Sequence, residues 1–82
     1  WRAHGGSEVD FVIEQDGRVV GVEVKAGQRV DARDLKGLVE CREALGSRFA
    51  HGIVLYGGAE VLPLGNRIFA VPLSFLRGER MM

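Results

Sequence analysis

The sequence contains a single cysteine, Cys41, so no disulfide can form within the chain. This low cysteine content is typical of proteins in a reducing compartment. No apolar run approaches the roughly 20 residues that a membrane-spanning helix requires. No secretory signal pattern stands at the start of the chain. We therefore expect a cytoplasmic protein with no membrane partner.

An excess of charge of one sign is also lacking, because 11 Lys and Arg residues balance 11 Asp and Glu residues. Binding of nucleic acid through overall positive charge is therefore not expected, although a local basic patch is compatible with this balance. Only two histidines are present, and no Cys or His spacing is typical of a zinc site. A Walker-type lysine motif is absent, so we expect no ATP site within this chain.

What the sequence does contain is the composition of a small folded domain. The chain has 82 residues, of which 46% are hydrophobic and 27% are charged. These values are ordinary for soluble globular proteins, and a chain of this length has room for one thin core. We predict one domain over residues 1–82. Since the chain starts at Trp1 and not at Met, we expect it to be the C-terminal part of a longer protein.

An N-terminal β-hairpin is the clearest local pattern. Residues 8–14 alternate between polar and β-forming apolar residues, and residues 18–25 form the return strand. The intervening Asp16-Gly17 pair favours a two-residue type I′ turn, since both of its positions need a positive φ. With that turn, the numbers of paired residues sum to 33. One face is then apolar and carries Val9, Phe11, Ile13, Val20, Val22 and Val24.

The rest of the chain predicts an α/β fold with a small mixed β-sheet. Asp31 is a good N-cap for a helix that ends at Gly46. Residues 51–56 form a short apolar strand, and a right-handed crossover places this strand parallel to the second hairpin strand. Residues 61–71 predict a weaker second hairpin, in which Pro63 lies on an edge strand because proline cannot donate to a ladder.

The other face of the first hairpin carries the candidate chemistry. The register places Asp10 opposite Glu23 and Glu8 opposite Lys25. Two directly opposed carboxylates repel each other unless a cation compensates, and Mg²⁺ or Mn²⁺ prefers such hard oxygen ligands. The backbone carbonyl of Val24 is a further candidate ligand. Lys25 could orient or deprotonate an attacking water, or stabilise negative charge that develops on a phosphate.

These motifs resemble a known group of proteins. Glu8-Val9-Asp10, a hairpin and then Glu23-Val24-Lys25 are similar to the PD-(D/E)xK nuclease superfamily, which has a restriction-endonuclease-like fold. More narrowly, the chain resembles the C-terminal DUF4143 domain that follows an AAA-type ATPase module in many bacterial and archaeal proteins. The stretches that carry this narrower resemblance are Trp1-Arg2, EVDFVIE, GVEVKAG, GIVLYGG and VLPLGNRIFAVPLSFL.

The resemblance implies a metal-dependent phosphodiester hydrolase that acts on DNA or RNA. By position, Asp10 and Glu23 are the metal ligands and Lys25 is the catalytic lysine. The superfamily often adds an acidic residue from a helix before the first core strand. That helix is not in this chain, and Glu8 could substitute for its carboxylate. The resemblance also implies an upstream ATPase module in the parent protein.

The charged face is also compatible with two alternatives to a nuclease site, and several residues near it are weaker candidates for substrate contact. Gly21, beside the charged residues, leaves space for a substrate backbone. In the first alternative, the charged face is a solvated surface with Glu8–Lys25 and Glu23–Lys25 ion pairs, which contribute about 0–1 kcal/mol each. In the second, the domain is a non-catalytic interaction module attached to the ATPase, or a homo-oligomer that pairs through an exposed edge strand. The weaker candidates for substrate contact are Glu8, Gln28, Arg29 and Lys36.

Overall fold

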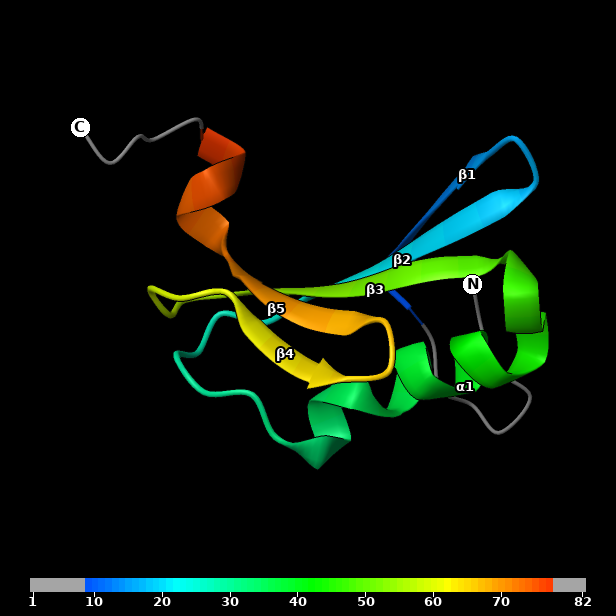
Figure 1. The fold of residues 1–82 in the computed structure, drawn as a ribbon. Helices are drawn as coiled ribbons and strands as arrows, with labels where there is room; N and C mark the ends of the chain where they lie inside the picture. The colour runs from blue at the N-terminus through cyan, green and yellow to red at the C-terminus, as the bar shows by residue number, and fades with distance from the viewer. Residues whose placement is uncertain (1–8, 78–82) are drawn as a thin grey trace.

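The computed structural model describes residues 9–77, which form one five-stranded sheet, one α-helix and short 3₁₀ turns. The sheet is mixed and has the strand order β1-β2-β3-β5-β4, and α1 lies under one of its faces (Figure 1). The predicted α/β class is confirmed. In chain order the elements are β1 (Phe11–Gln15), β2 (Arg18–Val24), η1 (Ala32–Leu35), α1 (Lys36–Leu45), η2 (Gly46–Arg48), β3 (Phe49–Tyr56), β4 (Leu62–Gly65), β5 (Ile68–Pro72) and η3 (Leu73–Arg77).

The first hairpin forms with the predicted turn and register. Asp16 and Gly17 have φ angles of 54° and 79°, as a type I′ turn requires. This turn matches the twist of the flanking strands, so its two-residue length fixes the pairing of β1 and β2. The confirmed pairs are Phe11 with Val22, Val12 with Gly21, Ile13 with Val20, Glu14 with Val19 and Gln15 with Arg18.

The first hairpin differs from the prediction at its open end. The predicted place of Val9 in the apolar face opposite Val24 is wrong, because β1 begins only at Phe11. Val9 is 3% exposed and belongs to the core on the α1 side of the sheet. The physical reason lies at Asp10, whose side chain accepts the backbone N–H of Val24 and so replaces a backbone pairing there.

The helix begins and ends where the sequence predicts, although its first turn is tighter. Asp31 is the N-cap and forms a reciprocal capping box with Asp34. The first turn, η1, is a 3₁₀ helix, and α1 follows without a break until Gly46, whose φ of 56° favours glycine. Leu38 on α1 is fully buried against the sheet. None of the helices within residues 9–77 is long and apolar enough to cross a membrane.

The second half of the sheet follows the prediction closely. β3 is parallel to β2, and β4 lies at the sheet edge and contains Pro63. The turn before β5 lies at Asn66-Arg67, directly after Gly65, the last residue of β4. Arg67 has a φ of 65°, and its side chain donates to the backbone carbonyls of Gly46 and Phe49. These two hydrogen bonds compensate for an unfavourable backbone conformation.

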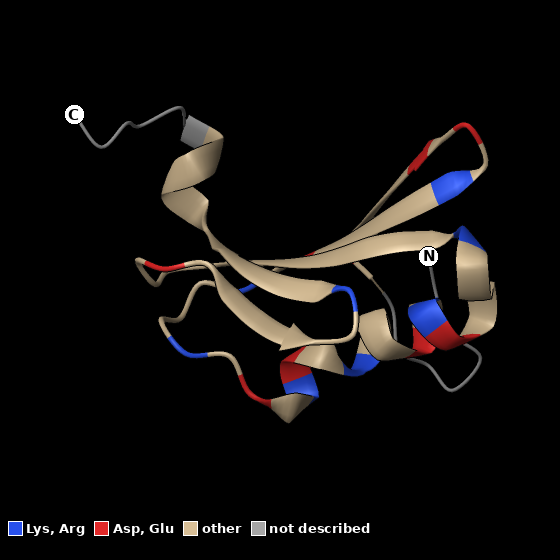
Figure 2. Cartoon of the chain, viewed as in Figure 1, with Lys and Arg blue, Asp and Glu red and all other residues tan. Residues whose placement is uncertain are grey.

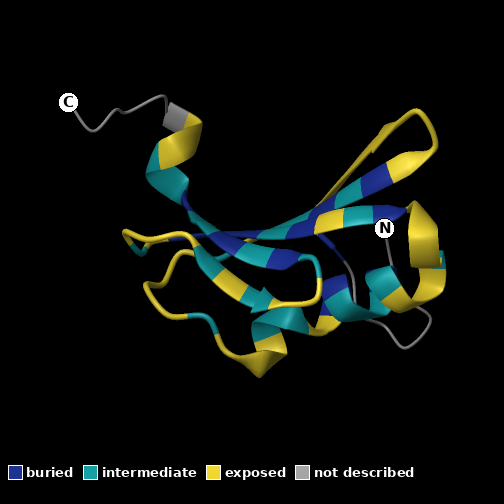
Figure 3. Cartoon of the chain, viewed as in Figure 1, coloured by how far each residue is buried: buried dark blue, intermediate teal, exposed yellow. Residues whose placement is uncertain are grey.

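The core lies between α1 and the sheet, and the opposite sheet face is open. Figure 3 shows buried residues where the strands approach α1 and exposed residues along β1. Within residues 9–77 no helix lies across the other face (Figure 1). On that face Phe11, Ile13 and Val24 are 59%, 57% and 43% exposed. The core consists of Val9, Leu38, Cys41, Phe49, Val54, Tyr56, Ile68 and Ala70.

Candidate functional site

Asp10 and Glu23 meet at the end of β2. Asp10 lies just before β1, and its Oδ2 accepts the backbone N–H of Val24 at 2.9 Å. This bond holds the Asp10 carboxylate beside the last residues of β2, where it contacts the Glu23 carboxyl group. The structure therefore brings together the two carboxylates that the register predicts. They meet through a side-chain bond to the backbone and not through the strand pairing itself.

Glu23 is half-buried, and its environment favours the protonated carboxyl. Burial, and after it the neighbouring Asp10 carboxyl, together raise the pKa of Glu23 from 4.5 to about 7. A hydrogen bond from the Asp10 backbone acts in the opposite direction and does not overcome these effects. The two carboxyls thus form a site that favours either a shared proton or a cation.

This pKa predicts a stability that falls as the pH rises. Between pH 4.5 and about 7 the folded protein keeps a proton on Glu23 that the unfolded chain has lost. The free energy of unfolding therefore decreases with pH over this window, and the loss is complete above pH 7. Because Glu23 is only half-buried, we expect a loss of about 1–2 kcal/mol after solvent screening. Urea unfolding in EDTA at pH 5, 6, 7 and 8 measures it.

The variant Glu23→Gln isolates this contribution. It should match the wild type at pH 5, where Glu23 is protonated in the folded state, and should be more stable at pH 8 by about 1–2 kcal/mol. Glu60→Gln, at an exposed carboxylate, is the matched control and should follow the wild type at every pH. A Glu23→Gln variant with an unchanged pH slope would show that Glu23 is not the responsible group.

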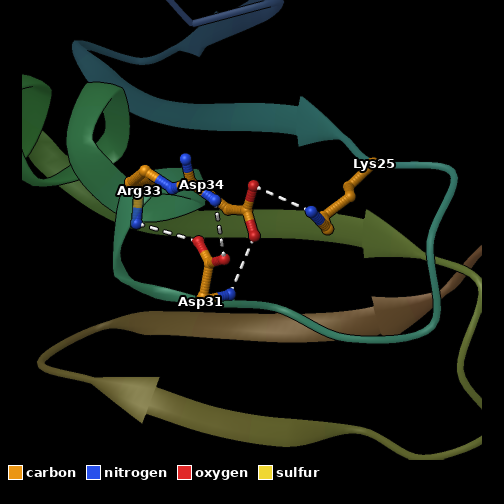
Figure 4. Close-up of polar contacts among 4 residues, drawn as sticks. All are labelled: Lys25, Asp31, Arg33 and Asp34. Carbon is orange, nitrogen blue, oxygen red and sulfur yellow. Dashed lines mark hydrogen bonds and ion pairs between the residues drawn. The ribbon is translucent and has the colours of Figure 1, made fainter.

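Lys25 lies just beyond β2 and forms an ion pair that the sequence analysis did not predict. Its Nζ is 3.1 Å from Oδ1 of Asp34, and its backbone N–H donates to the carbonyl of Leu55 (Figure 4). The ion pair between Glu23 and Lys25, expected for a solvated surface, is replaced by this contact. Glu8, its other expected partner, lies outside the described residues. Asp34 is the residue that the prediction missed, although the Asp-x-x-Asp capping pattern contained the signal.

Gly21 shows why a solvated surface is the wrong description for most of this β2 face. Val19 is 4% exposed, and a Cβ atom on Gly21 would lie 2.9 Å from Cδ2 of Leu38. The space expected for a substrate beside Gly21 is therefore filled by α1. The short Gly21 residue allows this close packing of helix on sheet. Only the C-terminal end of the face, at Glu23 and Lys25, reaches the surface.

The site provides two carboxylates for a cation and no larger set of ligands. Within residues 9–77, no group of three or more His, Cys, Asp or Glu side chains is placed to hold a metal ion. Asp34, whose charge also acts on Glu23, receives hydrogen bonds from Lys25 and from the backbone N–H of Asp31. The Asp10–Glu23 pair is sufficient only for a cation that completes its coordination shell with water or substrate oxygens, as Mg²⁺ does.

Comparison with known proteins assigns the family. The sequence model of the domain of unknown function DUF4143 matches residues 1–76. The chain belongs to the DUF4143 family. No curated protein and no solved structure is significantly similar to it. The match confirms the resemblance to the DUF4143 domain. The description of the DUF4143 family states no activity, so a function for this domain has to be inferred from its site.

Three of the weaker candidates lie within residues 9–77 of the DUF4143 domain and are exposed, namely Gln28, Arg29 and Lys36. Gln28 lines an open cavity of about 660 Å³ together with Tyr56 and the Gly57-Gly58 backbone. Figure 2 shows basic and acidic residues interspersed along α1 and along the loop between β2 and η1. This surface therefore carries charges of both signs.

Proposed function

We propose that this DUF4143 domain is a nuclease-like domain that binds Mg²⁺ or Mn²⁺ and hydrolyses phosphodiesters in DNA or RNA. One observation carries the proposal. Asp10 and Glu23 contact each other at the end of β2, and Lys25 follows Glu23 by two residues. The order of these residues along a hairpin, followed by a helix and a parallel strand, supports a restriction-endonuclease-like core of the PD-(D/E)xK superfamily.

The donor set fits a hard divalent cation. Both side chains are carboxylates, and mutual repulsion and burial disfavour their charged forms when no cation is present. Asp10 and Glu23 would hold the metal, and the carbonyl of Val24 is a further candidate ligand. A cation bound there would polarise a phosphoryl oxygen and lower the pKa of a water molecule.

The chain's own residues supply the remaining functions. Lys25 carries a compact positive charge that can orient a phosphate group and stabilise negative charge that develops on it. Arg29 and Lys36, both exposed, can contact neighbouring phosphates of a nucleic-acid strand. Since the net charge of the chain is zero, we expect such contacts to be local and binding by this domain alone to be weak.

Direct assay of cleavage tests the proposal. The protein is incubated with single-stranded and double-stranded DNA and RNA in Mn²⁺ or Mg²⁺, and in EDTA as the control. We expect metal-dependent cleavage of at least one of these substrates. Cleavage that persists in EDTA, or intact substrates in all four cases, would contradict a metal-dependent nuclease.

Metal binding should also stabilise the folded protein. A ligand that binds only the folded state at ten times its Kd adds about 1.4 kcal/mol to the free energy of unfolding. For a domain of this size that corresponds to a rise in Tm of roughly 5–10 °C. The rise should be larger at pH 8 than at pH 5.5, because a proton on Glu23 competes with the cation. Thermal unfolding followed by circular dichroism measures both.

Asp10→Asn is the matched variant for this titration, since an amide keeps the shape and loses the charge. It should abolish most of the Mn²⁺-dependent rise in Tm. An equal rise in Asp10→Asn and in the wild type would place the cation elsewhere on the protein.

A second candidate function is a non-catalytic interaction module attached to an AAA-type ATPase. The open apolar sheet face favours it, because Phe11 and Ile13 are 59% and 57% exposed there. The Mn²⁺ titration separates the two candidates. A Tm that does not respond to Mn²⁺, together with association of the protein in light scattering, would favour the interaction module.

A further inference from the structure

Asp34 lies where the chain returns to the end of β2. The short segment after Lys25 leads into η1, and the capping box at the start of η1 fixes Asp34 in place. Its Oδ2 accepts the backbone N–H of Asp31 at 2.7 Å, and the Asp31 side chain in turn accepts the backbone N–H of Arg33 at 3.0 Å. The Asp34 carboxylate is therefore held by backbone geometry and is not a freely moving side chain.

The second oxygen of this carboxylate holds Lys25. Oδ1 of Asp34 accepts from Nζ of Lys25 at 3.1 Å, and the two side chains are only 20% and 31% exposed. Figure 4 shows the Lys25 side chain turned from the end of β2 toward Asp34, with Arg33 on the far side of Asp34 and Asp31 drawn below it. The hydrogen bond from Asp31 lowers the pKa of Asp34, and Lys25 lowers it further, so the carboxylate stays charged.

We propose that Asp34 is the positioning residue of Lys25, and that it fixes the ammonium group just beyond the end of β2, the strand that carries Glu23. The proposal rests on the proposed function for its consequence in catalysis. An ammonium group has three N–H donors, and one donor to Asp34 leaves two for phosphate oxygens. A long lysine side chain at the surface otherwise loses rotamer freedom when it binds a phosphate. Asp34 removes much of that freedom before the substrate arrives.

The first experiment needs no substrate, and Lys36 serves as its internal reference. Lys25 and Lys36 are the only two lysines in the sequence. Limited acetylation, followed by peptide mass spectrometry, gives the rate at each lysine within one sample. In Asp34→Asn we expect the ratio of the Lys25 rate to the Lys36 rate to rise roughly two- to fivefold, as expected for release of a partly exposed ion pair.

Asp31→Asn is the matched control, because it changes the other acid of the same capping box and does not touch Lys25. Its backbone N–H still donates to Asp34, so the ratio of the two acetylation rates should stay at the wild-type value. An unchanged ratio in Asp34→Asn would overturn the proposal. An equal rise in both variants would also overturn it, since the effect would then come from the cap and not from the ion pair.

The second experiment measures cleavage with Mn²⁺. Asp34→Asn should lower kcat roughly tenfold or more and change KM little, because a positioned charge acts mainly in the transition state. Asp34→Glu should restore part of kcat, and Asp31→Asn should keep it. Wild-type kcat in Asp34→Asn would overturn the catalytic part of the proposal. Absence of cleavage in the wild type would refute the proposed function instead, while the acetylation ratio would still decide whether Asp34 holds Lys25.

Discussion

Replacement of Lys25 by alanine is expected to lower the kcat for Mn²⁺-dependent cleavage by about 10²–10⁴-fold. A general acid or base, or a preorganised charge at a phosphate, contributes about this much. The fold should survive the change, since a partly exposed ion pair such as Lys25–Asp34 contributes about 1 kcal/mol or less. Single-turnover assays at saturating enzyme measure the chemical step separately from binding.

Arg33→Ala is the charge-matched control for Lys25→Ala. The Arg33 side chain is 93% exposed and forms a long contact of 3.6 Å with Asp31, so this variant removes one nearby positive charge without disturbing Lys25. It should cleave within about threefold of the wild type. An equal loss in both variants would mean that Lys25 acts only through the general electrostatic field. Cleavage by Lys25→Ala at the wild-type rate would exclude a catalytic role for this lysine.

The register of the first hairpin could be predicted because it depends on local chemistry. A two-residue Asp16-Gly17 turn leaves one pairing of the flanking strands, and the structure has that pairing from Phe11 to Gln15. The helix ends could be predicted for the same reason, since Asp31 and Gly46 act on adjacent backbone groups. Each of these features is specified by residues close together in the sequence.

The partners of the site residues could not be predicted in the same way. Whether Lys25 meets Glu23 or Asp34 depends on where the chain returns after a loop, and no local pattern specifies that path. The raised pKa of Glu23 likewise depends on burial by elements distant in the sequence. The candidate ligands could thus be named from the sequence, whereas their protonation and their partners needed the fold.

Which face of the sheet α1 covers could not be predicted from local sequence patterns either. The alternation of residues in the hairpin predicts one apolar face, and that face is the open one. The helix covers the other face because Gly21 and Gly52 leave room there for Leu38. Central parallel strands are usually covered on both faces, whereas within residues 9–77 only the face toward α1 is covered by a helix.

Leu38→Ala is expected to destabilise the core strongly. Leu38 is fully buried, and it lies against the backbone at both Gly21 and Gly52, so it joins α1 to β2 and β3. We expect a loss of about 2–5 kcal/mol in the free energy of unfolding. A domain of this size has only about 4–12 kcal/mol in total. Urea unfolding measures the loss, and Val61→Ala, at a residue 51% exposed, should stay within about 0.5 kcal/mol of the wild type.

A double-mutant cycle with Gly21→Ala tests the contact itself. In the wild type the added Cβ would lie 2.9 Å from Cδ2 of Leu38, and we expect this overpacking to cost about 1–3 kcal/mol. In the Leu38→Ala background the same Cβ enters the space that the leucine has vacated, so its cost should largely disappear. The two changes should therefore be less than additive by about 1 kcal/mol or more. Strict additivity would mean that α1 does not pack on β2 through this pair.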